Sequence, residues 1–440
     1  MKKLLLVTTA IAGVALMSAQ ANAAVKLDLG GAFQGYGVAS DNNIANERGF
    51  ELRRLAEIYV SGETTLKNGL TLGAATETEI ANGDTSITMT KVNAFLSGNW
   101  GRVNFGVEDG AASLLQVEAP SADANIDGMA QNIHGIGASK ADLHATALNT
   151  DGFDTLLDYD HSDFTTVDRL TYITPKFSGA QLAVSYTPTN SIASSKNAMA
   201  TKTAAVGAID FNNTDTAGGA NTVVLTTDVT AVGSYENLWE AAFRYDREIR
   251  GHNLSLGAGY STSSLITDPT LTDADSLTGT TMNIANISDG IETYNVGINL
   301  EFNGFSLGGN YMIAMSEYAT DVNTTAATTT AGYGDIERAT YVIGAAYDNG
   351  PYHFGLSYLN QNSTYDAIDA GAAGPDAAVT VLDIPKQEYE ADKFTIGGGY
   401  EFGPGMNLRG SVAWGEFADK TTVANSNDFQ QVALGLDIQF

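Results

Sequence analysis

The residues that could do chemistry in this 440-residue chain are few and widely spaced. The five histidines show no HExxH spacing, and the chain has neither a Gly-x-Ser-x-Gly nucleophile turn nor a phosphate-binding glycine loop; the histidines are His134, His144, His161, His252 and His353. A Ser-His pair assembled from separate strands, with His252 or His353 as the base, is the hydrolase arrangement left open. We expect no enzyme and no cofactor.

Charge is the more informative chemistry. The chain has 51 Asp and Glu residues against 22 Lys and Arg residues, which gives a net charge of −29. Binding of nucleic-acid phosphates requires clustered Lys and Arg, so we expect no nucleic-acid partner. The absence of cysteine excludes thiolate metal sites and disulfide scaffolds. Acidic loops could bind Ca²⁺ weakly, but no twelve-residue loop has Ca²⁺-binding spacing, and we predict no dedicated metal site.

Residues 1–23 are predicted to be a cleaved signal peptide. Two lysines precede an apolar run over residues 4–17, and Ala21-Asn22-Ala23 has the small-x-small pattern of a cleavage site. The alternative is a membrane anchor, but the run is shorter than the ~20 residues that span a bilayer as a helix. Removal of this segment, with its two lysines, takes the net charge from −29 to −31. The mature chain, 24–440, is therefore expected to be exported.

Alternation of apolar and polar residues predicts β-strands along the mature chain. In the last such segment Val432, Leu434, Leu436, Ile438 and Phe440 share one face, and that face is purely apolar. Sixteen segments are predicted: 26–38, 52–66, 70–80, 87–97, 102–108, 167–174, 180–187, 236–248, 253–262, 291–302, 305–315, 337–348, 352–361, 391–402, 406–417 and 428–440.

The predicted connections are of two kinds. Every second one is a tight turn, such as Arg250-Gly251 and Asn303-Gly304, and the others range from the short segment 81–86 to the long segment 109–166. Every proline lies in a predicted connection, where it removes no hydrogen-bond donor from a ladder. Lipid cannot satisfy free backbone groups, so strands cross a bilayer only in a closed sheet. The pattern predicts one all-β domain, a 16-stranded antiparallel transmembrane barrel with short periplasmic turns and long extracellular loops, whose width leaves an aqueous channel.

A secreted β-helix or adhesin is the alternative to a barrel. Such proteins are also acidic, cysteine-free and rich in Gly, Asn and Thr. The sequence has no repeat of fixed period and no Gly-Gly-x-Gly-x-Asp array, which disfavours this alternative.

Several segments resemble those of a known family. The stretch Arg169–Pro188 (RLTYITPKFSGAQLAVSYTP) resembles the strand-turn-strand that follows the constriction loop of Gram-negative general-diffusion porins, particularly those of alphaproteobacteria. Phe50–Gly62, the turns at Tyr347–Pro351 and 403–405, and the terminal Phe440 are also similar. The resemblance implies a trimeric porin in the outer membrane of a Gram-negative bacterium, in contact with its lipid, for passive diffusion of ions and small hydrophilic solutes. It also implies that Phe440 is an assembly signal.

The same resemblance implies that the third long connection, 109–166, folds inward and narrows the pore. If the apolar face of each strand points outward, eight bases point into the lumen: Arg53, Lys91, Arg102, Arg169, Arg244, Arg338, Lys393 and Arg409. The first three are expected to face the loop acids Glu118, Asp123 and Asp127 across a constriction. Two such rows make a transverse field. A substrate-selective channel stays an alternative, although no dense aromatic or basic ladder lies on the inward face. The net charge predicts a modest cation preference.

The outward positions predict where copies of the chain meet. Strands six to fifteen of the prediction have many outward aromatic residues, as interfacial girdles require, whereas the first five have only Phe33 and Phe105. We expect the first five strands and the sixteenth to form the interface of a homotrimer. Arg54 would point outward there on strict alternation, unless a β-bulge between Arg53 and Arg54 turns it inward.

Overall fold

The computed structural model describes residues 25–42, 49–80, 87–131, 133, 157–161, 167–189, 233–267, 290–320, 323–324, 327–328, 332–366, 386–420 and 426–440. The predicted signal peptide, His134 and His144 lie outside these residues.

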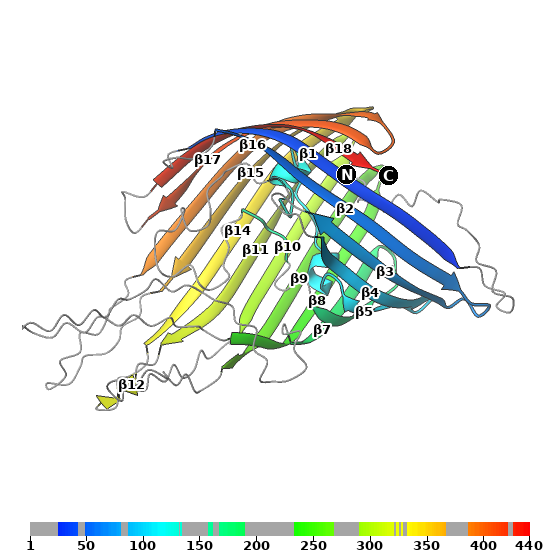
Figure 1. Cartoon of the computed structure of the whole chain (residues 1–440), viewed down its shortest axis with the longest axis horizontal. Coiled ribbons are helices and arrows are strands. Elements are labelled where there is room, and N and C mark those ends of the chain that lie inside the picture. Colours follow the sequence, from blue (N-terminus) through cyan, green and yellow to red (C-terminus); the bar gives the residue numbers. More distant parts are fainter. Residues whose placement is uncertain are drawn as a thin grey trace, which may run out of the picture.

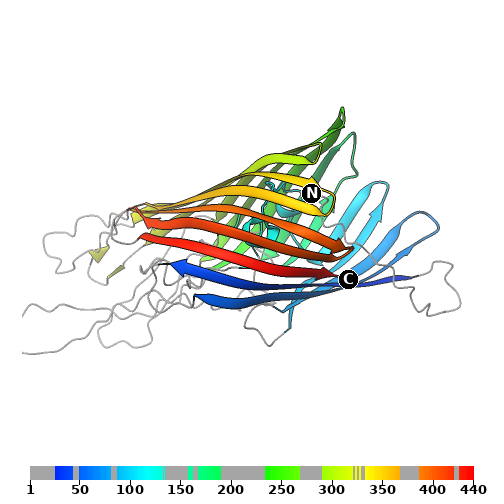
Figure 2. The same cartoon turned by 90° about the horizontal axis from the view of Figure 1, so that it is seen from above.

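Sixteen strands close into one antiparallel barrel, as the alternation predicted (Figure 1). They are β1 (Lys26–Asn42), β2 (Phe50–Thr65), β3 (Thr71–Ile80), β4 (Thr88–Gly98), β5 (Gly101–Val107), β6 (Asp168–Ile173), β7 (Ala180–Thr189), β8 (Gly233–Ile249), β9 (His252–Thr267), β10 (Ile291–Phe302), β11 (Phe305–Thr320), β14 (Gly332–Asn349), β15 (Tyr352–Tyr365), β16 (Gln387–Gly403), β17 (Met406–Asp419) and β18 (Ser426–Gln439). Figure 2 shows β18 beside β1, the pair that closes the barrel. The closed barrel rules out the β-helix alternative.

Several strands extend further toward the long connections than the sequence predicted. Strand β16, for example, begins at Gln387 rather than at residue 391. Its outward positions there are polar, at Glu390 and Asp392, and Asp392 still pairs with Asn360 of β15. Hydrophobic alternation therefore ends before the backbone ladder does.

One short hairpin and two short helices were not predicted. The hairpin of β12 (Asn323–Thr324) and β13 (Ala327–Thr328) is a separate two-stranded sheet. The helices α1 (Ala111–Leu114) and α2 (Ala124–Asp127) lie in segment 109–166, which we call the inward loop. No helix in the described part of the chain combines the length and apolarity needed to cross a bilayer.

Tight turns join the strands at one end of the barrel. Arg250 and Asn303 have φ angles of 54° and 48°, and the glycines after them have φ angles of 83° and 84°. Two successive residues with positive φ form the turn whose twist matches that of a hairpin, so the Arg250-Gly251 and Asn303-Gly304 turns are confirmed. Both ends of the barrel sequence lie on this side. There the backbone of Phe440 exchanges hydrogen bonds of 2.8 and 3.0 Å with Gly31.

Apolar side chains cover the outside of the barrel. Leu434 on β18 is 60% exposed, and the alternation places such residues outward on every strand described. Outward aromatic pairs form two belts, one toward the long connections and one toward the tight turns: Tyr186–Trp239, Tyr260–Tyr294 and Phe394–Trp414 in the first, and Phe302–Phe305 and Tyr352–Tyr400 in the second. These belts are what a lipid-facing wall requires.

The wall from β1 to β5 has a different outer face. It is mainly aliphatic, although Phe50 and Trp100 add exposed aromatic side chains that the prediction left out. Phe50 joins this wall because β2 begins two residues earlier than predicted. In the β1–β2 register Arg53 pairs with Tyr36 and Arg54 with Gly35, without a shift. The β-bulge hypothesis is therefore wrong, and the exposed Arg54 points outward.

The buried core lies between the inward loop and the barrel wall. One cluster packs Tyr159 and Ala119 of the loop against Val342, Leu359 and Phe429 of the wall. Two smaller clusters bury Ile126 and Ile133 against β1 and β18, and Ala111 and Leu115 against β7 and β8. The loop is thus fixed to the inner surface by ordinary apolar burial.

Candidate functional site

The inward loop enters the barrel at an anchor on β6, β7 and β8. The Glu240 carboxylate accepts a hydrogen bond of 3.1 Å from the backbone N–H of Ala111, which also donates to Ser185 Oγ at 2.8 Å. Arg169 Nη1 lies 3.1 Å from the same carboxylate, and both side chains are 2% exposed. A buried carboxylate needs such partners, so Arg169 and the loop backbone together neutralise and orient Glu240.

The loop returns along itself through residues 157–161. Gln116 Nε2 donates to the Tyr159 carbonyl at 2.6 Å, and the His161 N–H donates to Gln116 Oε1 at 2.8 Å. The His161 ring is fully buried, with Ser261 Oγ at 2.8 Å and Asn295 Nδ2 at 2.5 Å. The return segment therefore binds both the outgoing segment and the wall at β9 and β10.

The tip of the loop is shaped by two carboxylates. Asp123 caps α2 by accepting from the Asn125 N–H, a role for which Asp is well suited. Asp127 accepts 2.8 Å bonds from the N–H groups of Ala122 and Asp123, and a 2.5 Å bond from Ser357 Oγ of β15. Burial raises the pKa of Asp127 above its usual range and raises the pKa of Asp123 to about 6.

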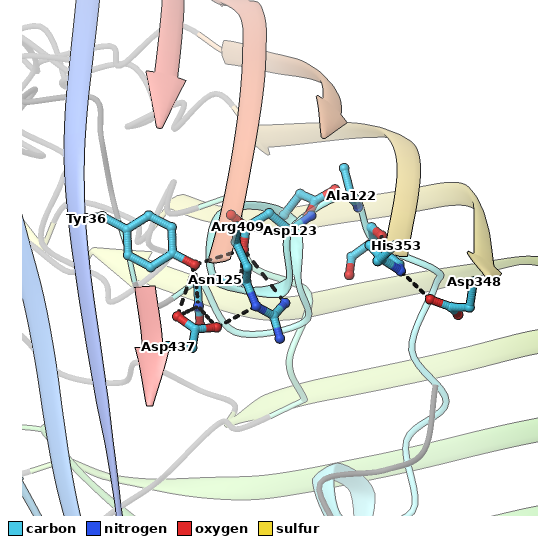
Figure 3. Close-up of polar contacts among 10 residues, drawn as sticks. Tyr36, Ala122, Asp123, Asn125, Asp348, His353, Arg409 and Asp437 are labelled. Atoms are coloured by element: carbon cyan, nitrogen blue, oxygen red, sulfur yellow. Dashed lines mark hydrogen bonds and ion pairs between the residues drawn. The ribbon is translucent and has the colours of Figure 1, made fainter. Parts of the chain in front are cut away.

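A polar network joins the loop tip to the seam where the barrel closes (Figure 3). Asn125 Nδ2 donates to both Asp437 oxygens at 3.1 Å and to Tyr36 Oη at 2.8 Å. Arg409 Nε lies 2.5 Å from Asp437, and its Nη1 lies 3.9 Å from Asp123. Residues of β1, β17 and β18 thus bind one turn of the loop, which we call the seam network.

Two further wall residues bind the loop through its backbone or an amide. Lys393 Nζ donates to the Ile126 carbonyl and, at 2.7 Å, to Gln131 Oε1. His353 lies 2.7 Å from an Asp348 oxygen and 3.0 Å from the Ser121 carbonyl (Figure 3). An ionised carboxylate and a carbonyl oxygen can only accept hydrogen bonds, so the two contacts favour the doubly protonated form of the His353 ring. Asp158, in the return segment, has its pKa raised to about 7 by burial.

The wall from β2 to β5 carries bases among a larger number of acids. Lys91 Nζ lies 2.8 Å from Asp109, 3.7 Å from Glu77 and 4.0 Å from Glu108. Glu57 is paired directly with Glu79 across β2 and β3. Such a cross-strand pair of like charges is unfavourable. Because acids outnumber bases on this wall, it concentrates negative charge in the lumen.

The other two predicted constriction bases have local contacts. Arg53 forms an ion pair with Glu51 of its own strand. The Arg102 guanidinium lies 3.9 Å from the centre of the Phe95 ring, and its Nε donates to Asn104. Of the three predicted loop acids, Asp123 contacts β1 and β17, Asp127 contacts β15, and Glu118 is exposed. Two opposed rows of Arg53, Lys91 and Arg102 against these acids stay a prediction.

The remaining predicted lumen bases lie on inward positions. Arg169 and Arg409 contact carboxylates, as described above, and Lys393 contacts loop oxygens. Arg244 donates from Nη1 to the Gln116 carbonyl at 2.9 Å, and Arg338 is half-buried on β14. Sequence reasoning missed Tyr36, Asn125, Glu240 and Asp437. Their signal was present, since Tyr36, Glu240 and Asp437 are polar residues at inward positions of strands.

The histidines proposed as hydrolase bases have other surroundings. His353 contacts a carboxylate and a carbonyl oxygen, and the His252 ring packs edge-on against Phe302. Within the described residues, no group of three or more His, Asp or Glu side chains is arranged to hold a metal ion. Weak Ca²⁺ binding by the acidic loops stays a prediction.

A sixteen-stranded barrel with a loop bound inside it is the arrangement of a membrane channel. The sequence matches the family model of Gram-negative porins over residues 8–420. The chain belongs to the Gram-negative porins. This porin is therefore an outer-membrane protein whose barrel is a diffusion channel.

Solved structures share the fold of this porin. They include OmpT of Vibrio cholerae with loop L8 deleted (10% identity, TM-score 0.51), an anion-selective porin from Comamonas acidovorans (14%, 0.50) and Salmonella typhi OmpF in complex with daunomycin (17%, 0.50). Each alignment covers 94% of this chain and 99%, 100% and 98% of the respective relative. No curated protein matches the sequence significantly.

Proposed function

We propose that this porin is a general-diffusion channel for ions and small hydrophilic solutes, narrowed by the inward loop 109–166. The observation that carries the proposal is the binding of the loop to the inner wall along its described length, from Ala111 at β7 and β8 to Asn125 at the seam. A loop held inside a wide barrel reduces the open cross-section, because it occupies lumen that side chains of the wall do not fill.

We further propose a preference for cations. Three of the inward bases, Arg169, Arg244 and Arg409, form ion pairs with acids, and Lys91 lies among three acids. Their positive charge is therefore largely compensated. Exposed acids such as Glu118, together with a chain net charge of −29, leave a negative lumen. Such a field attracts cations.

Two earlier expectations about cellular context belong to the same proposal. The chain assembles as a homotrimer through β1 to β5 and β18, where the outer face is largely aliphatic and carries Arg54. Phe440, which is 63% exposed, is the C-terminal aromatic residue that the assembly machinery recognises.

Conductance of the purified, folded protein in a planar bilayer tests the channel. We expect discrete current steps, and a reversal potential of cation sign under a KCl gradient. A folded sample without current steps would contradict the channel. A clear chloride preference would contradict only the proposed selectivity.

Deletion of residues 112–161 tests the role of the loop. We expect a higher single-channel conductance, because the loop obstructs flow and its described residues contribute no ladder hydrogen bonds to the barrel. Heat-modifiable electrophoretic mobility would check that the barrel is folded. Unchanged conductance of a folded deletion variant would show that the loop does not narrow the channel.

A further inference from the structure

A strip of the inner wall that has no side chains faces residues 115–122 of the inward loop. It consists of one inward glycine on each of five strands: Gly257, Gly297, Gly308, Gly344 and Gly355. In the register Gly257 is directly opposite Gly297, and Gly308 is directly opposite Gly344. Such pairs forgo the cross-strand side-chain contacts that stabilise a sheet. Glycine inside a strand often marks the close approach of another backbone, and we call these residues the glycine strip.

The loop backbone occupies the space that side chains would take. A Cβ atom on Gly344 would lie 1.8 Å from the Pro120 carbonyl oxygen, and one on Gly355 would lie 2.4 Å from the Ser121 carbonyl oxygen. Cβ atoms in proteins essentially never come within 3.0 Å of such an atom. At these positions, therefore, even a methyl group requires the loop or the wall to move.

Donors beside the strip hold the loop against it. They bind three carbonyl oxygens of the loop: Arg244 binds that of Gln116 at 2.9 Å, Asn310 that of Val117 at 3.0 Å, and His353 that of Ser121 at 3.0 Å. All three contacts are made to the main chain. The wall thus fixes the path of the backbone and leaves the side chain of Glu118 exposed to the lumen.

We propose that the glycine strip sets the distance between the inward loop and the wall, and through it the size limit for solutes of this channel. The proposal rests on the channel function proposed above. A methyl group on the strip would move the loop toward the lumen, because each strand of the wall is held by ladders on both sides and the loop is not. The free cross-section would then decrease without any change in charge.

The test compares Gly344→Ala and Gly355→Ala with the control Gly399→Ala. Gly399 is an inward glycine of β16, and the three atoms nearest to a Cβ atom there belong to Leu408, Arg409 and His353 of the wall; the closest is the Leu408 carbonyl oxygen at 3.1 Å. Planar-bilayer recordings give conductance, and liposome swelling with sugars of increasing size gives the size limit. We expect both to fall for Gly344→Ala and Gly355→Ala and to keep the parent values for Gly399→Ala.

The same substitutions in the chain lacking residues 112–161 separate loop displacement from damage to the barrel. There Gly344→Ala should leave conductance unchanged, because no loop remains to be displaced. Gly344→Ala could also prevent folding of the full chain. In that case the proposal is supported if the loop-deleted chain with the same substitution folds, and it is overturned if that chain does not fold either. Parent-like or higher conductance of both full-length glycine variants also overturns it. If the unsubstituted protein conducts and the glycine variants conduct equally well, only the proposed role of the glycine strip is wrong. If the unsubstituted protein folds but does not conduct, the proposed channel function is wrong as well.

Discussion

At the scale of single residues, the lumen charges differ in what holds them. Asp123 and Asp127 are bound by backbone N–H groups and wall side chains, whereas Glu118 is exposed on the lumen side of the loop. Glu118 is therefore a carboxylate of the inward loop that ions in the channel can reach.

Replacement of Glu118 by Gln is expected to weaken the cation preference and to leave conductance at high salt nearly unchanged. The change removes one charge but little volume. Its effect should be largest at low salt, because the Debye length falls from ~10 Å at 0.1 M to ~3 Å at 1 M. Reversal potentials at the two salt concentrations measure it. The control is Asp366→Asn, the same change of charge at an exposed site beyond β15; an equal effect of both would contradict a special position for Glu118.

Docking of the loop is expected to strengthen as pH falls. The pKa of Asp158 is about 7 in the docked loop, against about 4 for an exposed Asp. Between pH 4 and pH 7 the docked form therefore binds more protons than the undocked form. The carboxyl leaves docking unopposed below pH 4, opposes it increasingly as the pH rises toward 7, and opposes it fully above 7. Hydrogen exchange of residues 113–131, corrected for intrinsic rates, should show more protection at pH 5 than at pH 8. The variant Asp158→Asn should show a smaller difference, and an undiminished difference would assign the effect to other groups.

At the scale of elements, the start of the inward loop depends on an ion pair between β6 and β8. Arg169→Met would leave the Glu240 carboxylate with its loop contact but without its guanidinium partner. Removal of one member of a buried pair costs about 3–5 kcal/mol, and we expect a loss of that order in the free energy of unfolding, measured by urea titration in detergent. The Arg169→Met/Glu240→Met double variant should recover most of this loss. A single variant as stable as the parent would contradict the interpretation of the pair.

The seam network connects elements that are far apart in the chain. Tyr36 of β1 and Asp437 of β18 are 401 residues apart and contact the same loop residue, Asn125. The loop can make these contacts only after the first and last strands have met. Docking of the loop tip is therefore coupled to closure of the barrel.

At the scale of the whole molecule, the two sides of the barrel are built for different surroundings. The wall from β7 to β17 has two aromatic belts, as a lipid-facing surface requires. The wall from β1 to β5 is mainly aliphatic and carries an outward Arg54. An arginine exposed to lipid at the bilayer midplane costs ~2–4 kcal/mol, so this wall is better suited to contact with another subunit.

Crosslinking locates the subunit interface. The chain has no native cysteine, so single cysteines at Ala56 or Ala74, on the outer face of β2 and β3, provide unique reactive sites. We expect these variants to be trapped as oligomers by a short crosslinker, because they would lie in the interface. Cysteines at Tyr294 or Tyr341, in the aromatic wall, are the matched controls and should stay monomeric on denaturing gels. Trapping only of the controls would place the interface on the opposite wall.

The sequence by itself determined the barrel. Outward residues must be apolar in lipid and ladders must be unbroken, and both constraints act on neighbouring residues. The last strand, the turns at Arg250-Gly251 and Asn303-Gly304, and the inward orientation of Arg409 and Lys393 could therefore be predicted without knowledge of any distant contact.

Only the tertiary structure decided what the inward residues meet. Alternation assigns a residue to a face, but it gives neither its height in the barrel nor its partner across the lumen. Thus Asp123 and Arg409 were both expected in the lumen, but not at 3.9 Å from each other. Likewise, nothing in the sequence pattern around Gly344 indicates that the backbone of Pro120 packs against it. Such contacts depend on the path of a long loop through the barrel, and no local pattern in the chain determines that path.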